Sequence, residues 1–470
     1  MRRLKIKDVL FSSKKGDNIC VKGWVKTKRC SKNIIFISLN DGSTVNNLQI
    51  IIVNSFFLKE IDLSNISTGS SLVINGLLCD SIGTFQNFEL KANSIYILGK
   101  SDSNEYPLQP KKHSLNFLRD FLHFRFRTNT FGSIFRLRHA VNYSIHSFFY
   151  EKGFTFINTP IITSLDTEGA GDSFRVTTLK NNEADFIKDF FGKESNLTVS
   201  GQLALESASL GLSEVYTFGP VFRAENSNTT RHLSEFWMLE VEMAFSNLKD
   251  VINLSESLIK YIINFVFENC RNDIHFLNKQ DFDNKFKFRD SNFNILKMLE
   301  EILYSDFEIL TYTNAIKILK NSKDNLNNNF NFIIKNWGDE IQSEHEKYLS
   351  ESYFKKPLAI IDYPKNIKPF YMRENNDSLT VSAVDIIFPG IGEILGGSER
   401  EDRLDKLTSF MVDKNINKKD FLWYINTRLF GSAPHSGFGL GFDRLIQFLT
   451  GINNIKDVVP FPRTVKNLFC

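Results

Sequence analysis

One stretch, Phe218 to Phe245, limits what this chain can fold into more than any other, because it has the pattern of a single antiparallel hairpin. Two runs of alternating apolar and polar residues flank a short polar segment, as two strands and their turn do. One face of the second run is wholly apolar and consists of Trp237, Leu239, Val241, Met243 and Phe245. If that face packs on a core, the opposite face of the sheet collects Arg223, Glu225, Glu240 and Glu242.

The charged face of this hairpin has two interpretations. A half-exposed antiparallel sheet turns one polar face to solvent, and such a face needs no function. Alternatively, the face is a platform on which carboxylates hold a cationic group and arginine holds a phosphate, since its planar fork offers paired donors and stays charged. The turn adds Arg231 and His232 in a polar setting. The pattern alone leaves both interpretations open.

The size and composition indicate a globular protein of several domains. A chain of 470 residues is long enough for about three domains. Its 42% hydrophobic and 24% charged residues exclude general disorder. Five cysteines without a CxxC pair argue against a disulfide framework or structural zinc and favour a reducing compartment. No apolar run approaches the ~18 residues that span a bilayer. We therefore expect a cytoplasmic protein without membrane contact.

The charge is unevenly distributed along the chain. The net charge is only +3, yet residues 1–32 carry eleven Lys and Arg against two acidic residues, Asp8 and Asp17. Such asymmetry favours a polyanionic partner at the N-terminal end. A solvated basic surface remains the alternative.

Residues 17–98 predict a small β-barrel. Five β-like runs are separated by Gly, Asn and Asp turns, and the five-stranded barrel that binds oligonucleotides is the OB-fold. Phe36 and Gln49 fall on adjacent strands, with Arg29 nearby. An aromatic ring, an amide and a guanidinium together can stack on and read an unstacked RNA base. The alternative is that Phe36 belongs to the barrel core.

The middle of the chain predicts a linker and then an α/β region. A polar, proline-containing segment at 101–130 is followed by an amphipathic helix from Ser133 to Glu151 and a strand that reaches Pro160. The glycine-rich loop at 166–174 is either a plain surface loop or a lid that carries Glu168 over a substrate. Residues 246–356 are mainly helical and show no pattern that indicates chemistry.

The C-terminal part contains an acidic pair and a glycine-rich strand. Asp385 and Glu393 flank a glycine-bearing turn. Two such carboxylates suit a Mg²⁺ that bridges substrate phosphates, although an isolated acidic pair is commonly a solvated surface. Glycines alternate from 437 to 441, which lets a flat ligand lie against the backbone. Arg444 then falls in the first turn of a helix, where an anion is favoured.

Three motifs in this order resemble those of the class II aminoacyl-tRNA synthetases, in the subgroup of the asparagine, aspartate and lysine enzymes. They are the helix and strand ending at Pro160, the segment FRAENSNTTRHLSEFWMLEVEMAF, and GFGLGFDRLIQFLTG followed by VVPFPR at 458–463. The resemblance covers essentially the whole chain. It implies an α+β protein in which an N-terminal five-stranded OB-fold β-barrel (residues 1–100) and a linker (101–130) precede a catalytic domain (131–470). That domain would be an antiparallel sheet flanked by helices, with a mainly helical insertion at 246–356.

The resemblance implies a role for each matching residue. ATP would be bound by Arg223, Glu225, Arg231, His232, Phe236, Glu393, Gly441 and Arg444, of which Arg223 and Arg444 would be catalytic. The amino acid would be bound by Glu168, Ser200, Gln202, Glu225, Glu240 and Arg400. Mg²⁺ would be held by Asp385 and Glu393, and the tRNA anticodon by Arg29, Phe36 and Gln49. The motif ending at Pro160 forms the homodimer interface in the family.

The resemblance further implies asparagine as the amino acid and tRNA(Asn) as the partner, with no role for DNA. Aspartate enzymes carry a lysine three residues after the position of Gln202, where this chain has Leu205. A cation that would favour an aspartate side chain is thus missing. A second departure, Asp443 where glutamate is commoner, is expected to matter little. The alternatives are an aspartate enzyme that tolerates both tRNAs, a non-catalytic RNA-binding relative, and a ligase that forms asparagine without tRNA.

Overall fold

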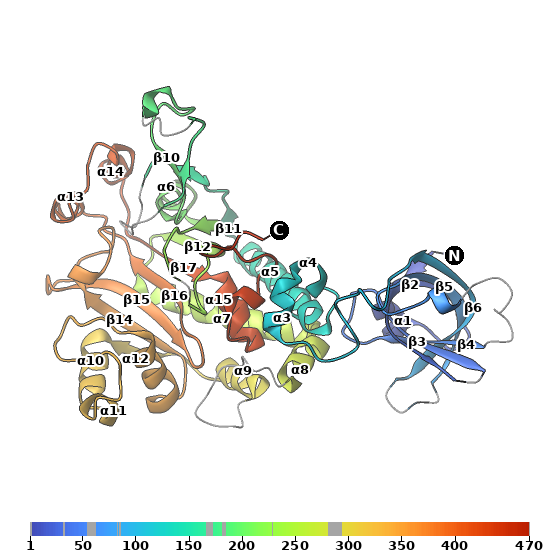
Figure 1. The fold of residues 1–470 in the computed structure, drawn as a ribbon. Coiled ribbons are helices and arrows are strands. Elements are labelled where there is room, and N and C mark those ends of the chain that lie inside the picture. Colours follow the sequence, from blue (N-terminus) through green and yellow to red (C-terminus); the bar gives the residue numbers. More distant parts are fainter. Residues whose placement is uncertain are drawn as a thin grey trace. The chain divides into compact units, whose positions relative to one another are not determined.

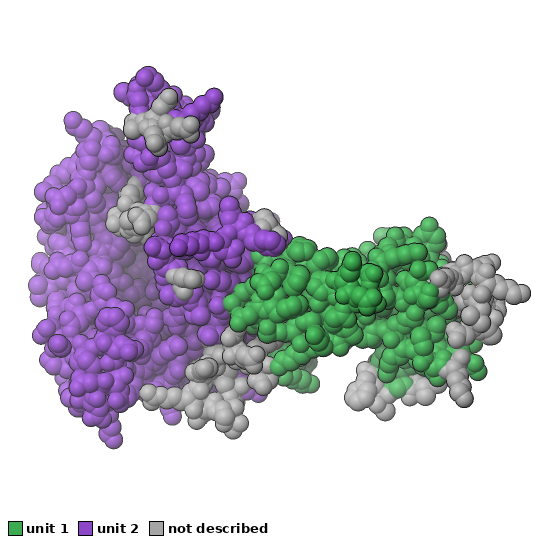
Figure 2. All heavy atoms as spheres, in the orientation of Figure 1, with its two compact units in different colours: residues 1–137, 271–283, 470 green, residues 138–270, 284–469 purple. Residues whose placement is uncertain are grey.

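The computed structural model of this chain describes residues 2–31, 33–53, 63–81, 83, 86–165, 173–180, 185–227, 229–280 and 294–469. The chain divides into two compact units (Figure 2). One comprises residues 1–137, 271–283 and 470, and the other comprises residues 138–270 and 284–469. Within the described ranges, no helix combines the length and apolar character needed to cross a membrane.

The first unit contains a closed β-barrel (Figure 1). Its strands follow the order β2-β3-β4-β6-β5, and pairing of β2 with β5 closes the circle. The bounds are β1 (Arg3–Leu4), α1 (Ile6–Ser12), β2 (Asn18–Cys30), β3 (Ile34–Asn40), β4 (Leu48–Val53), β5 (Ser71–Asp80) and β6 (Phe88–Gly99). The five strands expected between residues 17 and 98 are confirmed, and β1 adds a short parallel pairing to β2.

Alternation along the strands fills the barrel. On β3, Ile35, Ile37 and Leu39 are at most 5% exposed and belong to the barrel core, because successive strand residues face opposite sides. Helices α3 (Leu115–Asp120) and α4 (Leu122–Arg125) follow the barrel, and α5 (Asn129–Glu151) begins four residues before the expected helix start.

The second unit is built on a mixed, mainly antiparallel sheet (Figure 1). Among the described residues it has eight strands in the order β13-β14-β15-β16-β17-β12-β11-β7, and only its edge strands β13 and β7 pair in parallel. The bounds are β7 (Thr155–Phe156), β11 (Glu214–Phe222), β12 (Glu235–Ala244), β13 (Glu308–Thr311), β14 (Leu358–Pro364), β15 (Thr380–Phe388), β16 (Gly392–Glu399) and β17 (His435–Gly441). A small second sheet joins β8 (Ile162–Thr163), β9 (Arg175–Val176) and β10 (Ser195–Leu197).

Helices pack on both sides of the large sheet. Helix α7 contacts β15, β16 and β17, whereas α6 contacts β11 and β12. The bounds of the helices of the second unit are α6 (Gln202–Leu212), α7 (Leu248–Asn269), α9 (Ile295–Tyr304), α10 (Tyr312–Lys320), α11 (Lys323–Leu326), α12 (Ser343–Lys347), the π-helical turn η3 (Tyr348–Tyr353), α13 (Leu404–Asp413), α14 (Leu422–Leu429) and α15 (Phe442–Thr450). Helix α8 (Arg271–Lys279) belongs to the first unit. The region 246–356 is mainly helical as expected, but it also supplies strand β13 to the sheet.

The predicted hairpin is present as β11 and β12. Phe218 lies opposite Leu239 in the antiparallel register, so the two apolar faces coincide as predicted. Glu240 and Glu242 on the other face are 5% and 1% exposed, which rules out a solvated charged face for this part of the hairpin.

Three strand ends differ from the expectation. Strand β11 stops at Phe222, so Arg223 and Glu225 lie beyond the strand and not on its face. The apolar face was expected to include Phe245, but β12 stops at Ala244 and Phe245 is 79% exposed with φ +59°, because the chain turns there toward α7. The strand expected to reach Pro160 ends at Phe156. Alternation identifies a strand but does not locate the residue at which the backbone leaves the sheet.

Candidate active site

The floor of the candidate site is one row of residues across the large sheet. Asp385 lies opposite Gly396, Gly396 opposite Gly439, and Gly439 opposite Glu240 in the strand registers. Directly opposite residues share a face, so two carboxylates stand at the ends of a row whose middle has no side chains. The sequence folds this way because β12 and β15 place acidic residues, and β16 and β17 place glycines, at matching positions. The row can hold a ligand close to the backbone.

A pocket of about 180 Å³ opens beside this row and gathers every residue expected to bind ATP. Its lining includes Arg223, Glu225, Arg231, His232, Phe236, Glu393, Gly441 and Arg444. These residues come from the hairpin, its turn, β16, β17 and α15. The hairpin, the turn that carries Glu393 and the glycine-rich strand therefore meet at one pocket.

Two of the pocket arginines are held in position by main-chain and hydroxyl groups. The Arg231 guanidinium donates to the Ser343 hydroxyl at 2.9 Å, and the Arg444 guanidinium donates to the carbonyl of Glu393 at 3.2 Å. The Arg223 guanidinium lies 5.6 Å from the centre of the Phe236 ring. Three guanidinium groups beside an aromatic ring suit a phosphate chain attached to a planar base.

The turn of the hairpin adds a histidine and a carboxylate. His232 Nδ1 lies 2.5 Å from the Thr229 hydroxyl, and His232 Nε2 lies 3.9 Å from Glu225. Burial lowers the pKa of His232 against the opposing pull of Glu225. A neutral imidazole is therefore favoured beside the three arginines.

Asp385 and Glu393 approach each other above Gly396. A Cβ atom placed on Gly396 would lie 3.3 Å from Glu393 Oε1 and 3.4 Å from Asp385 Oδ1, so both carboxylates border the same small space. Burial and the neighbouring Asp385 carboxylate raise the pKa of Glu393. Lys368 Nζ donates to both oxygens of Asp385, at 3.0 and 2.7 Å. No cluster of three or more metal-binding side chains occurs in the described ranges, and a Mg²⁺ shared with substrate phosphates needs only one or two carboxylates.

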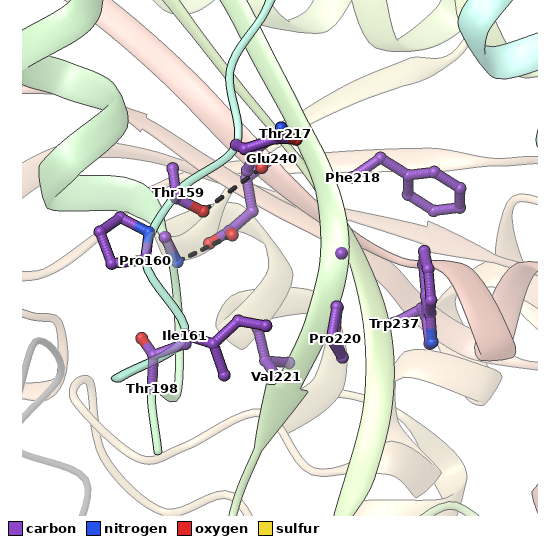
Figure 3. A pocket seen from close by; sticks show the side chains of 13 residues that line it. Thr159, Pro160, Ile161, Thr198, Thr217, Phe218, Pro220, Val221, Trp237 and Glu240 are labelled. Carbon is purple, nitrogen blue, oxygen red and sulfur yellow. Dashed lines mark hydrogen bonds between the residues drawn. The ribbon is translucent and has the colours of Figure 1, made fainter. Parts of the chain in front are cut away.

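The other end of the row is a polar pocket around Glu240. The Ser200 hydroxyl and the main-chain N–H of Gly201 both donate to the Glu240 carboxylate, the latter at 2.9 Å. Burial raises the pKa of Glu240 in spite of these two hydrogen bonds. Figure 3 shows Glu240 beside Thr159 and Pro160, in a cavity of about 200 Å³ along β11. A buried carboxylate in this setting favours a cationic ligand group.

Gln202 and Arg400 approach the same carboxylate, that of Glu206. Gln202 Nε2 donates to Glu206 Oε1 at 2.9 Å, and Arg400 Nε lies 3.9 Å from that oxygen. Arg400 is only 2% exposed and is bonded through Nε and Nη2 to Glu242. Burial raises the pKa of Glu242 to about 7, opposed by Arg400 and assisted by Glu206. Glu168, the remaining residue expected to bind the amino acid, lies outside the described residues.

The residues expected to read RNA share the outer face of the barrel. Phe36 on β3 lies opposite Arg29 on β2, and Gln49 on β4 lies opposite Ser38 on β3. Phe36 is partly exposed, whereas its neighbours Ile35 and Ile37 fill the core. The alternative that Phe36 is a core residue is therefore wrong.

Several residues of the site were not found from the sequence. Glu346 of α12 accepts the main-chain N–H of Glu393 at 3.1 Å, and burial with the nearby Glu393 carboxylate raises its pKa to about 7. Glu206 was missed although it stands four residues after Gln202, a helical spacing that places both on one face. No local pattern marks Glu346, Ser343 or Lys368.

Comparison with protein families gives two matches. The model of class II tRNA synthetases (D, K and N) matches residues 114–465. The model of the OB-fold nucleic acid binding domain named for the tRNA anticodon matches residues 19–98. The second match coincides with the barrel, and the first covers the large sheet with its pocket.

Similar proteins with assigned names share nearly the full length of the chain. The chain is 50% identical to an asparagine–tRNA ligase of Borreliella burgdorferi and 49% identical to one of Cytophaga hutchinsonii, covering 99% of both chains in each case. Its fold matches the crystal structure of asparaginyl-tRNA synthetase from Pyrococcus horikoshii complexed with asparaginyl-adenylate. That match has a TM-score of 0.84 at 28% identity over 100% of both chains.

Proposed function

This chain belongs to the class II tRNA synthetases of the aspartate, lysine and asparagine group, and on that premise we propose that it is an asparagine–tRNA ligase. The carboxylate of L-asparagine displaces pyrophosphate from ATP to form asparaginyl-adenylate, and the 3′ end of tRNA(Asn) then takes the asparaginyl group with release of AMP. The observation that carries this proposal is the single row from Asp385 to Glu240, with a cationic pocket beside it and further buried carboxylates near Glu240.

The cationic pocket binds ATP. Arg223 contacts the α-phosphate and the attacking carboxylate of asparagine, and it neutralises charge that grows in the transition state. Arg231 and Arg444 hold the distal phosphates, while the adenine lies between Phe236 and the bare backbone at Gly441. Glu225 and His232 complete the nucleotide contacts. The reaction needs no protein nucleophile, since asparagine itself attacks phosphorus.

The buried carboxylate end binds the amino acid. Glu240, supported by Ser200 and Gly201, accepts the α-ammonium group together with Gln202 and Glu168. Arg400 reads the side-chain oxygen, and Glu225 accepts from the side-chain NH₂ of asparagine, which an aspartate lacks. An aspartate side chain would leave the buried polar groups of the site without suitable hydrogen-bond partners. The resulting loss of binding energy makes the site selective for asparagine.

Asp385 and Glu393 hold Mg²⁺ at the phosphates. The small space that they border above Gly396 would suit an ion shared between protein and substrate. When bound, the ion stabilises negative charge on the phosphate oxygens. Lys368 keeps the Asp385 carboxylate in place until then.

The barrel binds the anticodon of tRNA(Asn). Arg29, Phe36 and Gln49 lie on its outer face, where an unstacked base can lie on the Phe36 ring while the amide reads its edge. The basic N-terminal stretch adds contacts to the RNA backbone. Recognition of this kind is directed at RNA and involves no DNA.

Two chains form a homodimer in the cytoplasm. Large apolar side chains stay exposed on α5 and on the segment that follows it: Tyr143 and Tyr150, then Phe156, Ile161 and Ile162. An exposed apolar surface of this extent is typical of a subunit interface. Each chain consists of an anticodon-binding domain (1–100), a linker (101–130) and a catalytic domain (131–470).

ATP–pyrophosphate exchange with asparagine, aspartate and lysine in parallel tests the proposal. We expect exchange with asparagine and little with the other two. Exchange with aspartate alone would make the protein an aspartate enzyme. Absence of exchange with all three would favour an RNA-binding relative without catalysis.

A further inference from the structure

A cluster of buried charged side chains lies behind Gln202, and the proposed reaction leaves most of it without a role. Its members are Glu206, Glu242, Arg400, Tyr424, Arg428 and His435, none of them more than 6% exposed. Burying two guanidinium groups and two carboxylates is costly unless each is well paired. Because Glu206 of this cluster bonds directly to Gln202, the cluster can act on the amino-acid end of the site.

Glu206 is the centre of this cluster. Its Oε2 accepts from the Tyr424 hydroxyl at 2.6 Å and from Arg428 Nη2 at 2.7 Å, and lies 3.2 Å from His435 Nε2. Its Oε1 accepts from the Gln202 amide at 2.9 Å. Burial disfavours the carboxylate, but Arg428 and the hydrogen bond with His435 hold the pKa of Glu206 below its ordinary value. Glu206 is therefore ionised in the folded protein.

The hydrogen bond from Gln202 fixes the direction of its amide. Because the NH₂ group of Gln202 donates to Glu206, its carbonyl oxygen is turned away from Glu206. Gln202 is thereby prepared to accept from an ammonium group.

The cluster as a whole is balanced in charge. His435 Nδ1 lies 2.8 Å from the Ala433 carbonyl, which only accepts, and His435 Nε2 lies 3.2 Å from Arg428 Nη2, which only donates. His435 Nε2 also lies 3.2 Å from Glu206 Oε2, so the ring contacts both members of the Glu206–Arg428 pair. Arg428 pairs with Glu206 and Arg400 pairs with Glu242, so the two guanidinium groups are matched by two carboxylates.

Arg400 keeps part of its donor capacity. Its Nε and Nη2 donate to Glu242, and its Nη1 donates to the Ser398 hydroxyl at 2.6 Å. Since a guanidinium has five N–H groups, one on each terminal nitrogen has no acceptor among the residues that the structure describes. These groups can bind an uncharged carbonyl oxygen although the positive charge of Arg400 is already matched by Glu242.

We propose that Glu206 is a specificity-determining positioning residue, which orients Gln202 and balances the charge around Arg400 so that the site takes a carboxamide and refuses a carboxylate. Asparagine leaves the buried cluster neutral. Aspartate would add one uncompensated negative charge, which a buried site strongly disfavours. This inference rests on the proposed function, and it assigns the selectivity to a residue four positions beyond Gln202.

The test is ATP–pyrophosphate exchange by the full-length protein and by Glu206→Gln, with asparagine and aspartate compared. Removing one negative charge leaves the cluster at +1, so the ratio of kcat/KM for asparagine to that for aspartate should fall by about tenfold or more. The KM for ATP should stay within about twofold. The double variant Glu206→Gln/Arg428→Gln restores neutrality, and the ratio should move back toward that of the wild type.

Tyr424→Phe is the matched control, because it removes one hydrogen bond to Glu206 and no charge; its ratio should equal that of the wild type. Equal losses with both amino acids in Glu206→Gln, or an equal shift in Tyr424→Phe, would show a merely structural role and overturn the inference. If Glu206→Gln fails to fold, Glu242→Gln also removes one negative charge from the cluster. The ratio of kcat/KM for asparagine to that for aspartate should then fall in Glu242→Gln. A wild type that does not activate asparagine would contradict the proposed function instead.

Discussion

The side-chain amide of Gln202 donates a hydrogen bond to the carboxylate of Glu206, one turn further along α6, at 2.9 Å. This contact joins the amino-acid end of the site to a buried network that reaches Arg400 on one side and Arg428 on the other. The choice between asparagine and aspartate therefore depends on the charges of this buried network. Each part of the site leads to a separate prediction.

Arg223→Lys should lose adenylate formation while tRNA binding survives. Lysine keeps the charge but not the fork that contacts two oxygens, so we expect a loss of about 10²-fold or more in kcat for pyrophosphate exchange. A filter-binding measurement of tRNA affinity is the companion assay. Loss of both functions to the same extent would mean that Arg223 is a structural residue.

Phe36→Ala should weaken aminoacylation and leave asparagine activation unchanged. Loss of one stacking contact should raise the KM for tRNA by about tenfold. The matched control is Tyr96→Ala, which removes another exposed aromatic ring from the barrel, on β6, at 67% exposure. Unchanged aminoacylation in Phe36→Ala, or an equal defect in Tyr96→Ala, would contradict the assignment of the anticodon face.

Glu346→Ala should weaken the response to Mg²⁺. Glu346 accepts the main-chain N–H of Glu393 and so fixes the turn that carries that carboxylate. Loss of a group that positions a metal ligand lowers metal affinity by about 10–100-fold. The Mg²⁺ concentration that gives half-maximal activity should rise by the same factor. Glu344→Ala on the same helix is the control, because its carboxylate binds the backbone at Asn331 and Phe332 instead. An identical response in the two variants would refute this role.

Selectivity should fall on acidification. Because the pKa of Glu242 is raised to about 7, this carboxyl is ionised above that pH and becomes neutral below it, which leaves the cluster more positive. The groups that face Glu242 are Arg400, Glu206 and His435. The ratio of asparagine to aspartate activation should therefore decrease from pH 8 to pH 6. A ratio that rises over this range would contradict the charge balance, and Glu242→Gln, which removes the titrating group, should flatten the pH dependence.

The strands could be predicted from the sequence because alternation is a local property. The five barrel strands and the hairpin of β11 and β12 follow from it, and the resemblance added the pocket residues. The turn at Phe245 was missed, since a positive φ leaves no mark in an alternating pattern. The network around Glu206 was missed because Tyr424, Arg428 and His435 come more than 200 positions later, and only the folded sheet brings them together.

The helical region 246–356 illustrates the same limit. Its sequence shows helices but no chemistry, yet its last helix places Ser343 against Arg231 and Glu346 against Glu393. These contacts are made by a main-chain N–H and a hydroxyl, which no residue pattern encodes. The region therefore supports the phosphate end of the site.

The most direct measurement is the identity of the aminoacyl ester formed on RNA. The purified protein is given ATP, Mg²⁺, tRNA(Asn) and tRNA(Asp), with asparagine and aspartate at equal concentrations, and the esters on each tRNA are identified by mass spectrometry. The account predicts asparaginyl ester on tRNA(Asn), dependent on ATP, and no ester on tRNA(Asp). Aspartyl ester on either tRNA as the main product, or no ester at all, would contradict it.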